Sequence, residues 1–153
     1  MSCYTWAVIL FLSSVLAAAA SLAVSWVAEK SLTSPLTLIP GFLRLRLSHN
    51  PGIAFSIAIP SPWQEIIIVS ALIAVCMFAM TSKPSRLGTI AFGLVIGGAI
   101  GNLIDRFGDG LVTDYVSVGT FPVFNVADSF ITIGAGLLLL EGWLERPTKA
   151  KNA

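Results

Sequence analysis

Charged residues are scarce in this chain of 153 residues, of which 11% are charged and 56% are hydrophobic. Soluble domains carry roughly 25% charged residues, so this sequence has too little charge to cover a surface that faces water. The net charge is +1, with neither a basic nor an acidic tail, and we therefore expect no nucleic-acid partner. We expect most of the chain to be solvated by lipid.

Residues that carry metal or thiol chemistry are also few. Cys3 and Cys76 are far apart, and their spacing indicates neither a disulfide framework nor a zinc site. The single histidine, His49, has no cysteine or second histidine to complete a zinc site, and we interpret it as a loop residue at the membrane interface. The phosphate loops GxxxxGK[ST] and GxGxxG are absent. We expect no metal and no cofactor.

Long apolar runs are abundant. They cover residues 6–28, 63–80, 87–104 and 128–144, and a helix needs about 20 mostly apolar residues to cross a bilayer. Four spans put both termini on one side. The lysines and arginines that flank the spans favour a cytoplasmic location for the termini and for the short connection that contains Pro84. The sequence predicts an all-α membrane protein with one domain, residues 1–153.

The two connections on the far side contain β-prone segments. The first, residues 29–62, includes FLRLRL, whose alternation of apolar and basic residues is typical of a half-buried strand. The turn at Pro51-Gly52 follows, and then a strand-like run, IAFSIAI. The second connection, residues 105–127, includes LVTDYVSV. We predict a small sheet that rests on the outer membrane surface.

Polar residues cluster at the end of the third run. Asn102 lies three residues before Asp105 and four before Arg106, so the three share a helix face. An ordinary interpretation is a helix end at which Arg106 offsets an acid that the helix dipole disfavours. The alternative is a functional site, because ionisable residues in or beside membrane spans are costly.

Three further polar residues lie in the last third of the chain. Asn125 and Asp128 have the spacing of a helix cap, which is one interpretation of the pair. Asp114 lies in the apolar β-prone stretch without a basic neighbour in sequence. If the third and fourth spans are adjacent, Asp114 and Asp128 converge. Two close carboxylates share a proton, so that one is a general base and the other a general acid in peptide hydrolysis.

Glycine recurs in the third span at every fourth position, at Gly93, Gly97 and Gly101. Two consecutive GxxxG steps let another helix approach closely. We therefore predict that this face packs against a neighbouring span and has no chemical role.

Four ordered strings resemble the signature blocks of the lipoprotein signal peptidases. They are NPGIAFS (residues 50–56), GGAIGNLIDR (97–106), VTDY (112–115) and FPVFNVADS (121–129). The resemblance covers most of the chain. It implies that Asp114 and Asp128 form a catalytic dyad. It also implies that seven further positions shape or support the site: Asn50, Gly52, Asn102, Asp105, Arg106, Asn125 and Ala127.

The resemblance also implies an activity and a location. Members of this family are aspartic endopeptidases of the bacterial inner membrane that remove the signal peptide from prolipoproteins. They cut before a diacylglyceryl-modified cysteine. Their fold has four transmembrane helices and a small extracytoplasmic β-cradle, in agreement with the alternating segments described above. We expect a monomer whose partners are lipidated prolipoproteins and membrane lipid.

The sequence departs from the family pattern at the end of the first span. Family members carry an Asp-Gln pair four and three residues before a lysine, whereas this chain has Trp26 and Val27 before Lys30. The missing acid is not one of the expected dyad, so hydrolysis remains the expectation. Two alternatives stay open: a catalytically impaired scaffold that binds lipidated peptides, and a proton or ion carrier that uses the interfacial acids.

Overall fold

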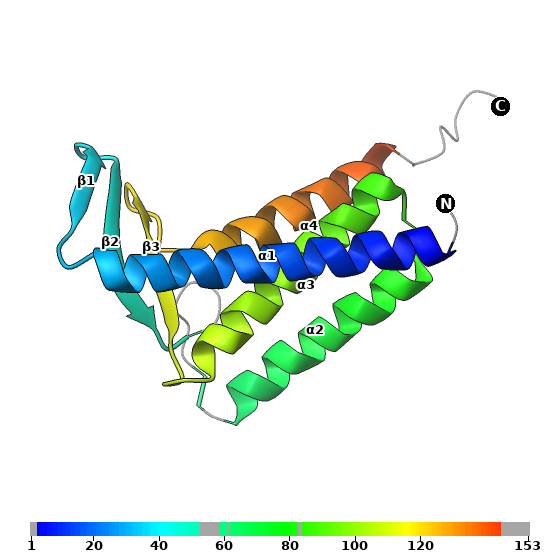
Figure 1. Cartoon of the computed structure of the whole chain (residues 1–153), viewed down its shortest axis with the longest axis horizontal. Helices are drawn as coiled ribbons and strands as arrows, with labels where there is room; N and C mark the ends of the chain where they lie inside the picture. Colours follow the sequence, from blue (N-terminus) through cyan, green and yellow to red (C-terminus); the bar gives the residue numbers. More distant parts are fainter. Residues whose placement is uncertain (1–2, 53–58, 61, 83, 145–153) are drawn as a thin grey trace, which may run out of the picture.

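The computed structural model describes residues 3–52, 59–60, 62–82 and 84–144. Within these residues, four helices are long and apolar enough to cross a membrane, as the sequence predicts. They are α1 (Cys3–Ser31), α2 (Trp63–Thr81), α3 (Arg86–Arg106) and α4 (Val126–Leu144). The start of α1 and the end of α4 lie at the same end of the bundle (Figure 1).

A small sheet lies at the other end of the bundle (Figure 1). Its three antiparallel strands are β1 (Leu36–Ile39), β2 (Leu43–Asn50) and β3 (Val112–Val118), in the order β1-β2-β3. The predicted strands in FLRLRL and LVTDYVSV are confirmed as β2 and β3. Strand β1 has no counterpart among the predicted strands, and most of IAFSIAI lies outside the described residues.

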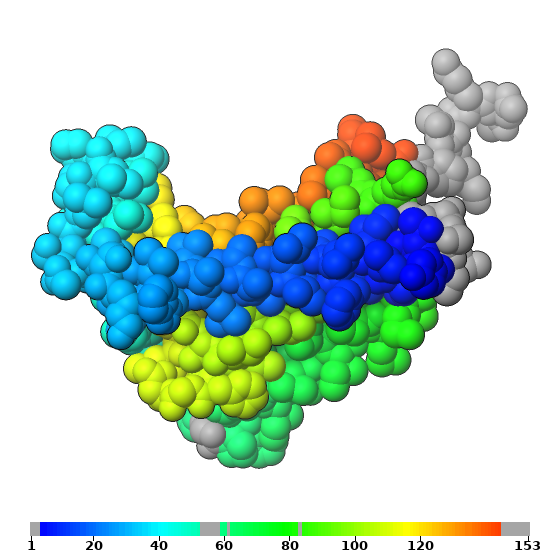
Figure 2. Space-filling model, viewed as in Figure 1, coloured from blue at the N-terminus to red at the C-terminus, as the bar shows by residue number. Residues whose placement is uncertain are grey.

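The sheet projects beyond the helices. The two strands β1 and β2 are joined by a turn in which Gly41 has a φ of 73°, a conformation that glycine adopts without steric cost. Between this projecting hairpin and α4 the surface is hollowed (Figure 2). The leucines at the start of β2 are half-buried while its two arginines are exposed, which explains the alternating sequence pattern.

Helix α3 packs closely against α1 along its glycines. A Cβ atom added to Gly97 would collide with the backbone carbonyl of Ser14 and the side chain of Ala17, both on α1. Cβ atoms added to Gly93 and Gly101 would likewise contact serine residues of α1. This confirms the predicted packing role of the GxxxG steps.

Another face of α3 packs equally closely against α4. A Cβ atom on Gly98 would lie 2.6 Å from the carbonyl oxygen of Ala127, and one on Gly134 of α4 would lie 2.6 Å from that of Ala91. The end of α3 and the beginning of α4 are therefore held side by side. This adjacency is the condition on which convergence of the two acids depends.

Candidate active site

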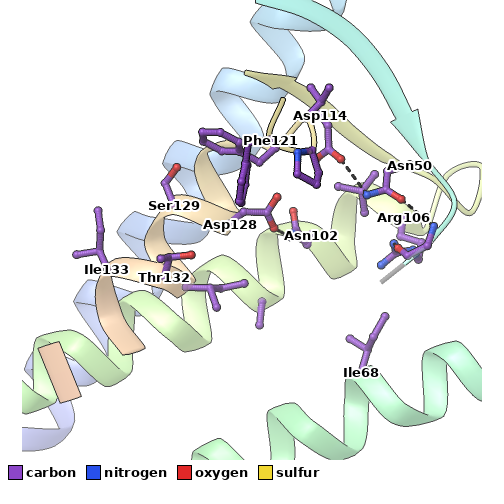
Figure 3. Close-up of a pocket in the computed structure, with 17 residues that line it drawn as sticks. Asn50, Ile68, Asn102, Arg106, Asp114, Phe121, Asp128, Ser129, Thr132 and Ile133 are labelled. Atoms are coloured by element: carbon purple, nitrogen blue, oxygen red, sulfur yellow. Dashed lines mark hydrogen bonds between the residues drawn. The ribbon is translucent and has the colours of Figure 1, made fainter. Parts of the chain in front are cut away.

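A cavity of about 700 Å³ lies among the sheet, α2, α3 and α4 (Figure 3). Both Asp114 and Asp128 line it, so the predicted convergence of the two acids on one site agrees with the structure. Much of the rest of the lining is apolar. The other lining residues are Asn50, Gly52, Ile68, Ala99, Asn102, Arg106, Val112, Phe121, Pro122, Val123, Phe124, Ser129, Ile131, Thr132 and Ile133.

Asp114 reaches the cavity from β3 and is only 2% exposed. Its Oδ2 accepts a hydrogen bond of 2.9 Å from Nδ2 of Asn50, at the end of the neighbouring strand β2. Its Oδ1 accepts one of 2.9 Å from Nδ2 of Asn125, which directly precedes α4. Both carboxylate oxygens are therefore held by amide donors, and the orientation of the carboxyl group is fixed.

Asp128 lies in the first turn of α4 and takes part in a reciprocal cap. Its backbone N–H donates to Oδ1 of Asn125 at 2.9 Å, and the N–H of Asn125 donates to Oδ2 of Asp128 at 3.3 Å. The capping interpretation of this pair is thus confirmed. The other oxygen, Oδ1, accepts a hydrogen bond of 2.8 Å from Nδ2 of Asn102 on α3. Capping therefore leaves one oxygen of Asp128 for interactions across the site.

Two asparagines connect the two acids. Nδ2 of Asn125, which donates to Asp114, also lies 3.0 Å from Oδ1 of Asn102, and Asn102 in turn donates to Asp128. These hydrogen bonds therefore join Asp114 on β3 to the start of α4, the start of α4 to Asn102 on α3, and Asn102 to Asp128 on α4. Because each amide has partners at both its oxygen and its nitrogen, the two carboxyl groups are held in a defined relative position.

Burial makes Asp114 a weaker acid than usual. Removal from water raises the pKa of Asp114 to about 6, against the hydrogen bond from Asn50, which lowers it, while the charge of Asp128 adds to the rise. A carboxyl group with such a pKa exchanges its proton near neutral pH, as acid–base catalysis requires.

Asp105 and Arg106 contact different parts of the chain. Oδ2 of Asp105 accepts a hydrogen bond of 2.7 Å from the N–H of Thr113, which ties the end of α3 to β3. Nη2 of Arg106 donates to the carbonyl oxygen of Gly52 at 2.5 Å. Within the described residues the two form no ion pair with each other. Arg106 still interacts electrostatically with Asp105, so the charge of this acid is offset without a direct ion pair.

The buried guanidinium of Arg106 nevertheless balances charge at the site. It is 8% exposed and interacts electrostatically with four carboxylates. These are Glu65, Asp114, Asp105 and Asp128. The remaining expected supporting residue, Ala127, is 2% exposed and meets Gly98, where α4 crosses α3.

The prediction that His49 is a loop residue is wrong. His49 lies on β2, and not in a loop, with Nε2 3.2 Å from Oε2 of Glu29 at the end of α1. This contact connects α1 to the sheet, next to Asn50. Among the residues that the structure describes, no three His, Cys, Asp or Glu side chains form a group that could hold a metal ion.

Two supporting side chains, Tyr115 and Gln64, are absent from the predicted site residues. The hydroxyl of Tyr115 accepts a hydrogen bond of 3.2 Å from the N–H of Val126, in the first turn of α4, and its pKa is raised by burial. Gln64 is buried in the first turn of α2 and donates to the carbonyl oxygen of Pro51. An aromatic residue beside an acid and a glutamine at a helix start are common, so neither carried a signal of its own.

Comparison with known proteins gives relatives over most of the chain. A family described as signal peptidase (SPase) II matches residues 9–144. The proteins named lipoprotein signal peptidase in Brucella ovis and Brucella abortus are each 48% identical over 119 residues, which is 71% of this chain and 72% of theirs.

Two solved structures share the fold. One is a bacterial membrane enzyme determined by the in meso method at 2.3 Å resolution, with a TM-score of 0.81, 26% identity, and coverage of 94% of this chain and 93% of that one. The other, a bacterial membrane enzyme at 1.9 Å resolution, has a TM-score of 0.78 and 28% identity, and covers 91% of this chain and 94% of that one.

Proposed function

Because this chain belongs to the signal peptidase II family, we propose that Asp114 and Asp128 are its catalytic dyad. The protein is a multi-pass bacterial membrane protease of the aspartic type, and it removes signal peptides from prolipoproteins. The observation that carries the dyad proposal is the pair of amides, Asn102 and Asn125, that holds both carboxyl groups on one cavity.

In the proposed reaction, the pair shares one proton. The ionised carboxylate takes a proton from a water molecule, whose oxygen attacks the carbonyl carbon of the scissile peptide bond. The protonated partner gives its proton to the carbonyl oxygen, and a tetrahedral intermediate forms. When the C–N bond breaks, the leaving nitrogen receives a proton from the dyad. The raised pKa of Asp114 makes it the residue that carries the shared proton in the free enzyme.

The cavity suits a lipid-borne peptide. Ile68 of α2 and two isoleucines of α4, Ile131 and Ile133, line the cavity. An apolar signal peptide gains contacts there while its cleavage site meets the acids. We propose that cleavage occurs before a diacylglyceryl-modified cysteine, and that lipid chains share this apolar environment. Both features follow from the family to which the chain belongs.

The supporting residues act by holding the dyad. Asn50 and Asn125 donate to Asp114, and Asn102 donates to Asp128. We propose that the others fix the backbone from which these amides reach, without touching the reacting atoms. Gly52 and Arg106 fix the backbone that follows β2, and Asp105 fixes the start of β3. Ala127 packs against Gly98, where α4 contacts α3.

We propose an inner-membrane location with cytoplasmic termini and an extracytoplasmic dyad, and a protein active as a monomer. The start of α1 and the end of α4 lie at the end of the bundle away from the sheet, which supports one shared side for the termini (Figure 1). Reporter fusions at Ser85 and at the C-terminus should indicate the cytoplasm, and fusions near Gly41 or Gly119 the outside. The inverted pattern would place the dyad on the wrong side for secreted precursors.

The decisive test is cleavage of a diacylglyceryl-modified precursor by the purified protein, beside the same precursor without lipid. We expect the lipidated precursor alone to be cut, with activity unaffected by strong chelators. Binding without cleavage would indicate the scaffold alternative, and no interaction at all would indicate the carrier. Neither alternative is favoured by the family membership. Activity that disappears in chelator and returns with a divalent ion would contradict the dyad.

A further inference from the structure

Gln64 is a buried polar residue in the first turn of α2, and it is 4% exposed. Its Nε2 donates a hydrogen bond of 2.9 Å to the carbonyl oxygen of Pro51, and its Oε1 accepts one of 3.3 Å from the N–H of Ile59. Both ends of the amide are therefore used. Burial of an amide is costly unless it is paired in this way, so the arrangement holds two separate backbone positions against α2.

The carbonyl that Gln64 holds is adjacent to one that Arg106 holds. Nη2 of Arg106 donates to the carbonyl oxygen of Gly52, and Nε2 of Gln64 donates to that of Pro51. Side chains from α2 and α3 therefore bind two consecutive carbonyl groups. These carbonyls directly follow Asn50. The backbone beyond the end of β2 is thus fixed from two sides.

This backbone in turn orients the amide of Asn50. The N–H of Gly52 donates to Oδ1 of Asn50 at 2.8 Å, which closes a local turn. With its oxygen engaged, Asn50 presents Nδ2 to Oδ2 of Asp114, at 2.9 Å. A displacement of the backbone at Pro51 and Gly52 would therefore move the Asn50 amide that binds the carboxyl group of Asp114; the side chains of Asn50 and Asp114 are seen in Figure 3.

We propose that Gln64 is a positioning residue for the peptidase reaction, because it holds the turn that directs the Asn50 amide to Asp114. The inference rests on the proposed role of Asp114 in the dyad. Gln64 does not line the cavity, so it acts through Asn50 and not on the substrate. Its removal should lower kcat and leave KM nearly unchanged.

A second effect separates positioning from general support of the fold. The hydrogen bond from Asn50 lowers the pKa of Asp114, so weakening this bond should raise that pKa further. The charges that face Asp114 belong to Asp128 on α4 and to Asp105 and Arg106 on α3, and replacement of Gln64 leaves them in place. The midpoint of the pH profile should therefore move to higher pH.

The test uses the full-length protein and a diacylglyceryl-modified precursor. Gln64→Met keeps the size of the side chain and removes both hydrogen bonds, while Gln64→Glu keeps an acceptor for Ile59 and removes the donor to Pro51. Each should reduce kcat by roughly tenfold, within the range that misplacement of a catalytic group costs. Ser70→Ala, which changes an exposed residue of the same helix, is the matched control and should have no effect.

A double-mutant comparison locates the effect. If Gln64 acts through Asn50, adding Gln64→Met to an Asn50→Ala enzyme should change neither kcat nor the pH midpoint further. Independent losses, an unshifted midpoint, or unfolding of both Gln64 variants in thermal unfolding experiments would overturn the proposal. An Asp114→Asn enzyme measured in parallel distinguishes the two levels. Its full activity would refute the dyad, whereas its inactivity beside unaffected Gln64 variants would refute only the role of Gln64.

Discussion

Helix α3 meets its neighbours in two different ways. Along α1 and α4 its glycines allow backbone to approach side chain and backbone, so that even one added methyl group would collide. Helix α2 makes fewer contacts with α3 and buries only Gln64 and Ala79 among its residues. The three helices α1, α3 and α4, which we call the frame, are thus closely packed, whereas most residues of α2 are not buried.

The two regions contribute different things to the site. The frame, together with β3, carries both acids and the bridging asparagines Asn102 and Asn125. Helix α2 contributes Ile68 to the cavity wall and Gln64 to the turn beyond β2. Close packing thus holds the two acids in place, while the less tightly packed helix α2 forms one wall of the cavity. Interiors packed without gaps resist small displacements, and this favours a fixed dyad.

The largest effect is expected when the two acids that the frame and β3 carry are replaced. If Asp128 were only a cap, Asp128→Asn would cost little, because asparagine is also a good capping residue. As members of a dyad, Asp114→Asn and Asp128→Asn should each lose roughly 10²–10⁴-fold in turnover. The double variant should be scarcely worse, because the two groups act as one unit.

This prediction is measured by cleavage of a lipidated precursor, with membrane insertion and folding checked for each variant. Asparagine is nearly isosteric with aspartate, so the variants should insert normally. Near-normal turnover by a well-folded single variant would end the dyad hypothesis.

The second prediction tests the close packing of the frame. Gly97→Ala places a methyl group against the Ser14 carbonyl and Ala17, and should lower the free energy of unfolding by about 1–3 kcal/mol, as overpacking does. Gly136→Ala is the matched control, because nothing lies within 4 Å of its added Cβ. Thermal unfolding in detergent compares the two. Equal stability of both variants would show that α1 and α3 are not tightly packed in the membrane.

The third prediction concerns pH. Burial raises the pKa of Asp114 to about 6, so the free enzyme loses the shared proton as the pH rises through that value. The measured kcat/KM should therefore decline on the alkaline side with a midpoint near 6, by about tenfold per pH unit beyond it. A pH titration of precursor cleavage checks this. If kcat/KM did not decline near this pH, Asp114 would take no part in the proton transfer.

The smallest effect is expected at Trp26, near the end of α1. Its side chain is 66% exposed, as suits the aromatic belt of a membrane interface. Trp26→Phe should therefore leave precursor cleavage nearly unchanged. A collapse in turnover of a correctly inserted variant would mean that this position takes part in the site, and that the departure from the family pattern has a catalytic consequence.

Local sequence patterns predicted much of this molecule because they report local physics. The four apolar runs predicted the four helices, since the hydrocarbon core requires long apolar segments whatever their partners. Alternation in FLRLRL predicted β2, and the Asn125–Asp128 spacing predicted a reciprocal cap. Family resemblance then led to the proposal of a dyad, which periodicity alone did not distinguish from a capped helix.

Tertiary structure decided which polar groups meet. Asp105 and Arg106 are sequence neighbours, yet one binds the backbone of Thr113 and the other that of Gly52, because successive helix residues point in different directions. Likewise, no pattern indicated that Gln64 reaches Pro51 or that His49 meets Glu29. The sequence by itself determined the membrane environment, the helices and the cap formed by Asn125 and Asp128, because hydrophobic length and capping are local. Only the packing of α3 against α4 and β3 brought Asp114 and Asp128 to one cavity, because the asparagine that binds Asp128 lies 26 residues away in the chain, on α3.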